Sequence, residues 1–86
     1  MPELSRFLGI AIFMYYEDHN PPHFHARYND FRAVISINDL LLVEGKLPAR
    51  VLGLVMEWAE LHKKELLENW DMVQKTGKWF KIEPLA

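Results

Sequence analysis

A predicted β-hairpin between residues 23 and 37 limits the fold more than any other part of the sequence. Apolar side chains alternate strictly with histidine and arginine from His23 to Tyr28, and an apolar segment, Phe31–Ile37, follows Asn29-Asp30. Successive side chains of a strand point to opposite faces, so the first segment is predicted to be a strand with two different faces. Asn29-Asp30 suits a two-residue turn, although Asn-Gly is commoner there. We therefore expect an antiparallel sheet.

The two-residue turn fixes the register of this hairpin and sorts its side chains onto two faces. One face is apolar and suited to core packing, with Phe24, Ala26 and Tyr28 opposite Ile35, Ala33 and Phe31. The second face, which we expect to be exposed, carries the chemically unusual residues, with His23, His25 and Arg27 opposite Ser36, Val34 and Arg32.

Further short strands and one long helix are predicted in the rest of the chain. Gly9–Glu17 is short and apolar, as is typical of a strand buried on both faces, and Leu40–Val43 is a short strand that stops at Glu44-Gly45. A helix is predicted from about Pro48 to Lys75, with Gly77 as its C-terminal stop. Its apolar stripe would consist of Val51, Leu54, Val55, Trp58 and Leu61.

These elements predict an α+β fold. We expect an antiparallel β-meander of three or four strands, packed through its Phe24/Ala26/Tyr28 face against one long C-terminal helix. With 86 residues and no repeat or linker, residues 1–86 are predicted to form a single domain.

Composition and charge restrict the function further. The chain has no cysteine, which excludes disulfides, thiolate nucleophiles and cysteine-based zinc sites. Its net charge of −2 argues against nucleic-acid binding through bulk positive charge but does not exclude a local basic face. The most apolar stretch, Phe7–Tyr16, is shorter than the roughly 20 residues of a membrane-spanning helix. We therefore expect a cytoplasmic protein without a membrane partner.

Three of the four histidines lie close together, at positions 19, 23 and 25. His23 and His25 share a face of the predicted strand, and the stiff Pro21-Pro22 connection could bring His19 or Asp18 beside them. Three interpretations of this cluster remain open.

The first interpretation is a metal site. Three imidazoles, from His19, His23 and His25, match a zinc-type arrangement with an open position. Asp18 or Glu17 would then be a fourth ligand, or would accept a hydrogen bond from an imidazole N–H.

The second interpretation is acid–base chemistry or recognition at phosphates. His23 and His25 are the candidate catalytic residues, because imidazole both gives and takes a proton near neutral pH. Arg27 faces Arg32 in the predicted register, and two such cations repel each other unless an anion lies between them. That anion would be a nucleic-acid phosphate or an acidic stretch of a protein partner, with Ser36 as a further binding residue.

The third interpretation is structural: the histidines bond backbone carbonyls in a proline-rich turn and do nothing else. On this view there is no cofactor and no catalysis.

The tail segment Lys78–Ala86 is expected to pack back onto the domain as an extended segment.

Several segments together resemble a family of short bacterial proteins, domain of unknown function 4160. They are Met14–Tyr28 with its Asp-His-Asn-Pro-Pro-His-Phe-His block, Glu44–Pro48, Trp58–His62, Asn69-Trp70 and Ile82–Leu85. The resemblance implies a component of a two-gene, toxin–antitoxin-like module whose partner is encoded by a neighbouring gene, and it brings no set of catalytic residues. We expect a regulatory or interaction protein that binds RNA or an acidic partner. Should it be an enzyme, ribonuclease-like or metal-dependent hydrolase activity is expected.

Overall fold

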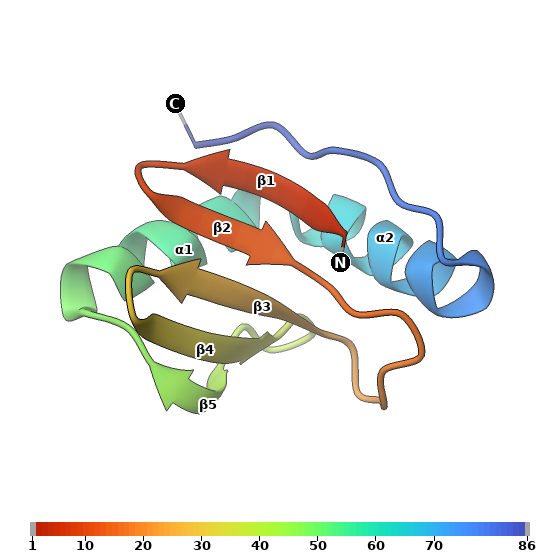
Figure 1. Cartoon of the computed structure of the whole chain (residues 1–86), viewed down its shortest axis with the longest axis horizontal. Helices are drawn as coiled ribbons and strands as arrows, with labels where there is room; N and C mark the ends of the chain where they lie inside the picture. Colours follow the sequence, from red (N-terminus) through yellow and green to blue (C-terminus); the bar gives the residue numbers. More distant parts are fainter. Residues whose placement is uncertain (1, 86) are drawn as a thin grey trace.

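A five-stranded antiparallel sheet and two helices form the domain (Figure 1). The computed structural model describes residues 2–85. The strands pair in chain order, so the predicted α+β meander is confirmed, with five strands in place of three or four and two helices in place of one. No helix in these described residues is long and apolar enough to span a membrane. The elements are β1 (Glu3–Phe7), β2 (Ile10–Phe13), β3 (His23–Tyr28), β4 (Phe31–Ser36), β5 (Leu42–Lys46), α1 (Ala49–Leu61) and α2 (Lys63–Thr76).

The N-terminal hairpin differs from the sequence prediction. The expected strand Gly9–Glu17 shortens to β2, whose four residues are all buried as predicted. It pairs with β1, which was missed because Ser5 and Arg6 interrupt its apolar pattern. Leu8 and Gly9 have positive φ values and make the turn between the two strands. The segment after Phe13 leaves the sheet and becomes part of the connection that carries the histidine motif.

The β3–β4 hairpin has the predicted register in every pair. Phe24 and Ala26 are buried under the helices, and the Phe24 ring lies 6.0 Å from that of Trp58 on α1. Both helices lie on this one side of the sheet (Figure 1). The prediction that Phe24 and Ala26 face the core is therefore correct.

The predicted single helix is divided at His62, whose φ of −118° and ψ of 23° are not helical. Its N–H still bonds to the Trp58 carbonyl at 3.1 Å, so α2 follows α1 directly. Leu61, predicted to lie on the apolar stripe, is 67 % exposed because α1 ends there. No proline or glycine marks this division, and the apolar spacing continues through it. The sequence therefore did not predict it. Beyond it α2 buries its own apolar stripe of Leu66, Trp70 and Val73.

The last strand was predicted to stop at Glu44-Gly45, but β5 continues through both residues. Gly45 pairs with Ala33 within β5 and has a φ of +79°, a conformation that glycine adopts readily. A Cβ atom at this position would lie 2.1 Å from the carbonyl oxygen of Arg32. A larger residue at position 45 would collide with this backbone. Glycine therefore lets β5 continue against β4 as far as Lys46.

The C-terminal segment runs extended as far as Leu85, as predicted, and lies beside β1, while Ala86 lies outside the described residues (Figure 1). The Ile82 N–H donates to the Leu4 carbonyl at 2.8 Å. The buried amide of Asn69 bonds both the N–H and the carbonyl of Phe80, and the Trp58 indole N–H donates to the Glu83 carbonyl. These bonds connect both helices to the tail.

Candidate functional site

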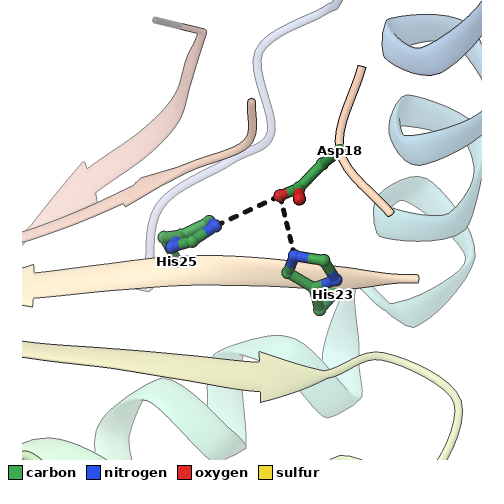
Figure 2. Close-up of side chains that lie close together, drawn as sticks. All are labelled: Asp18, His23 and His25. Carbon is green, nitrogen blue, oxygen red and sulfur yellow. Dashed lines mark hydrogen bonds and ion pairs between the residues drawn. The ribbon is translucent and has the colours of Figure 1, made fainter. Parts of the chain in front are cut away.

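Asp18, His23 and His25 converge on the face of the sheet opposite α1 (Figure 2). His23 begins β3 and His25 follows two residues later, so both imidazoles point to the same face. Asp18 comes from the connection between β2 and β3. Its Oδ2 atom lies 2.8 Å from Nε2 of His23 and 3.5 Å from Nε2 of His25.

Helix α2 positions Asp18 through Gln74. The Gln74 Oε1 atom accepts the Asp18 backbone N–H at 2.7 Å, and its Nε2 donates to the Tyr15 carbonyl at 2.9 Å. The His19 backbone N–H donates to Asp18 Oδ1 at 2.9 Å. One carboxylate oxygen is thus occupied by the backbone, and the other is directed at the two imidazoles.

His23 is buried, which corrects the expectation that it lies on an exposed face. Its side chain is 8 % exposed, because the Trp70 ring of α2 packs 4.9 Å from its own ring. Nδ1 of His23 donates to the Pro21 carbonyl at 2.8 Å. The register is as predicted, but α2 extends past the end of the strand and covers this imidazole. The bond to the Pro21 carbonyl is of the kind that the structural interpretation expects.

His25 is held by aromatic contacts. Its ring stacks on Phe13, the neighbouring residue of β2, at 5.4 Å, and meets the edge of Tyr15 at 4.5 Å. Burial lowers the pKa of His25, although the hydrogen bond to Asp18 acts in the opposite direction. For Asp18, burial acts to raise the pKa, but hydrogen bonds from the His19 N–H and from His23 outweigh it and leave the pKa below its usual value.

His19 does not join this group. Its side chain is 86 % exposed, and its Nδ1 lies 3.1 Å from the outer oxygen of Asp18. The structure thus brings together three of the four predicted metal ligands, Asp18, His23 and His25, whose ligand atoms all lie within 4.8 Å of one another. Glu17, the other carboxylate considered, is exposed and is not among them.

A pocket of about 230 Å³ opens in front of Asp18, His23 and His25. Ser36 and Glu44 also line it, as do Tyr15 and Val43. The pairing of β5 with β4 brings Glu44 there, in a cross-strand row with His25 two strands away. Neither Tyr15 nor Glu44 was predicted to belong to the site. The prediction that β5 stops at Glu44 left no sign that Glu44 would lie in this row.

A smaller pocket of about 180 Å³ adjoins the first and contains Arg32. Its lining includes the aromatic rings of Phe13, Tyr15 and His25. The two pockets share His25 and Glu44, so aromatic and charged groups meet along one stretch of the sheet.

Four cations form a row across the same face of the sheet. Strand pairing aligns Arg6 of β1, Arg27 of β3, Arg32 of β4 and Lys46 of β5, with Ala11 of β2 among them. The predicted opposition of Arg27 and Arg32 is confirmed. Arg6 pairs with Glu3 at 2.7 Å, whereas the ion pairs of residues 2–85 include none of the other three cations.

Comparison with known proteins identifies the family of this chain. Neither the curated proteins nor the solved structures include a match. A family model with the description "Domain of unknown function (DUF4160)" matches residues 9–71, which contain β2 to β5, α1, most of α2 and the whole Asp18/His23/His25 cluster. The tail contacts of Ile82 and Glu83 lie beyond the matched residues. The chain therefore belongs to the DUF4160 family.

Proposed function

We propose that this chain is a cytoplasmic regulatory protein that binds single-stranded RNA on the outer face of its sheet. The observation that carries the proposal is the row of Arg27, Arg32 and Lys46, which has no carboxylate partner among residues 2–85 and adjoins an aromatic pocket. The family resemblance extends the proposal to one half of a two-gene, toxin–antitoxin-like module.

The cation row supports binding of a polyanion. Neighbouring strands lie about 4.8 Å apart, and like charges directly opposite each other destabilise a sheet. Phosphates placed along the row would relieve the repulsion between Arg27, Arg32 and Lys46. Guanidinium groups suit this role because they bond phosphate oxygens in pairs. The low net charge of the whole chain does not oppose the proposal, since the row is a local feature.

The aromatic pocket favours RNA over an acidic protein segment. Phe13, Tyr15 and His25 contribute rings next to Arg32, and Tyr15 is partly exposed. Bases stack on such rings while the backbone contacts cations, which is how many proteins bind single strands. An acidic peptide would satisfy the arginines but has no bases for the rings.

Binding can be measured by fluorescence anisotropy with a labelled RNA of mixed sequence, about 12 nucleotides long. Arg32→Ala should weaken binding several-fold and reduce the salt dependence by about one unit of slope. Arg50→Ala is the matched control, because it removes the same charge from an exposed site at the start of α1, beside Leu8 and Val51. DNA of the same sequence and a poly-glutamate peptide are the competing ligands.

Equal losses in Arg32→Ala and Arg50→Ala would contradict a specific role for the row. Tighter binding of the peptide than of either nucleic acid would replace RNA by an acidic protein partner, and tighter binding of DNA would replace it by DNA. The module itself is tested by co-expression with the neighbouring gene product and pull-down. No complex, together with no growth effect of either gene alone, would remove that part of the proposal.

A further inference from the structure

We infer that Asp18, His23 and His25 form a binding site for one divalent transition-metal ion of the zinc class, with its open coordination positions facing the 230 Å³ pocket. A zinc ion lies about 2.0–2.1 Å from each of its nitrogen and oxygen ligands, so ligand atoms around it lie roughly 3–3.5 Å apart. The separations of Oδ2 from the two Nε2 atoms, 2.8 and 3.5 Å, need only small adjustments. The inference does not depend on RNA binding.

The hydrogen bonds of His23 fit the role of a metal ligand. The Pro21 carbonyl can only accept a hydrogen bond, so Nδ1 of His23 carries a proton. In the neutral ring, Nε2 is then a lone pair that faces the Asp18 carboxylate at 2.8 Å. Two acceptors at this distance repel each other unless a proton or a metal ion lies between them. A backbone carbonyl that fixes Nδ1–H and leaves Nε2 free is the usual support of a metal-bound histidine.

The carboxylate is supported in the same manner. Oδ1 of Asp18 accepts the His19 N–H, and Gln74 holds the Asp18 backbone, so Oδ2 is presented to the imidazoles. These bonds hold one ligand atom in place by contacts that are not themselves ligands, as metal sites require.

The charges around the pocket favour a cation over an anion. Asp18 and Glu44 both line it, and none of its lining residues is lysine or arginine. Of the cation row, Arg32 lines the adjoining pocket instead. Two imidazoles and one carboxylate suit zinc, iron, cobalt or nickel, whereas magnesium and calcium prefer oxygen ligands alone.

Titration calorimetry of untagged, chelator-treated protein with zinc chloride tests the site, and cobalt chloride gives a second readout in the visible absorption of the bound ion. We expect about one ion per chain. Changes to supporting residues cost about 10- to 100-fold in affinity, so His25→Ala or Asp18→Asn, which remove a ligand, should cost on the order of 100-fold or more. His62→Ala is the matched control, because it removes an imidazole that belongs neither to the cluster nor to the pocket lining, and the zinc affinity of this variant should equal that of the wild type.

Uptake below about a tenth of an equivalent of zinc and of cobalt would overturn the inference. So would a loss in His62→Ala as large as that in His25→Ala, since binding would then be nonspecific. Circular dichroism shows whether each variant is folded. Because His23 is buried, Asp18→Asn and His25→Ala carry the test if His23→Ala does not fold. RNA binding measured with and without chelator separates the two proposals, because either can fail while the other holds.

Discussion

Phe24 and His25 are neighbours in β3, yet their side chains are held in different ways. The Phe24 side chain is fully buried against the helices, where shape and apolar area determine its position. The His25 ring is held on the opposite face by a stack on Phe13 and by a polar contact with Asp18. The inner face thus supplies most of the stability, while the outer face depends on directional contacts.

The outer face gains part of its order from α2. Asp18 and His23 are positioned from α2, through the Gln74 amide and the Trp70 ring. The helix that supports the core on one side of the sheet therefore also fixes the polar cluster on the other. The end of β3 where His23 lies is therefore covered by α2, whereas Arg27 near the other end is exposed.

The largest expected effect is on the inner face. Phe24→Ala should lower the free energy of unfolding by about 3–5 kcal/mol, because it leaves a cavity against Trp58. Urea denaturation measures this change. His25→Ala should cost clearly less in the same assay with chelator present, and equal losses would break the comparison between the two faces.

An intermediate effect is expected at His23. In chelator, His23→Ala should cost about 1–3 kcal/mol, because the Pro21 carbonyl and the Asp18 carboxylate lose their partner in a buried place. Thermal and urea unfolding measure this change. A cost as small as that of His19→Ala would mean that the imidazole is not held as the structure describes.

A smaller effect on stability is expected at Gln74. Gln74→Ala should cost about 0.5–1.5 kcal/mol through two lost hydrogen bonds. The zinc affinity should also fall by about 10- to 100-fold, because Asp18 is then less firmly placed. Glu68→Ala is the control on the exposed side of α2. Unchanged zinc affinity in folded Gln74→Ala would show that α2 does not order the outer face.

The smallest effect concerns the end of the cation row. A hydrogen bond from Arg6 lowers the pKa of Glu3 below its usual value of 4.5. A carboxyl with a lowered folded-state pKa contributes stability above its unfolded pKa and loses that contribution as the pH falls. Arg6→Ala should return the pKa of Glu3 towards 4.5, measured by NMR titration. The contribution to stability is slight because the pair is exposed. An unchanged pKa would place Arg6 among the unpaired cations.

The β3–β4 hairpin could be predicted residue by residue because a two-residue turn leaves one register that keeps the apolar side chains together. The division at His62 could not, because the apolar spacing continues through it. At the site, alternation predicted the shared face of His23 and His25. Sequence could not show that Asp18 turns inward while His19 turns outward, since that choice depends on Gln74, which lies 56 residues away.

The two edges of the sheet differ, and this has a consequence for how the sheet can grow. The tail lies beside β1 and occupies the Leu4 carbonyl, whereas every residue of β5 is exposed. A strand added to a sheet must bond free backbone groups at an edge. Any extension of this sheet by another polypeptide is therefore directed to β5, where the apolar side chains of Leu42 and Val43 are exposed. Lys46 and the left-handed Gly45 at the other end of β5 interrupt a flat edge and oppose uncontrolled stacking of chains.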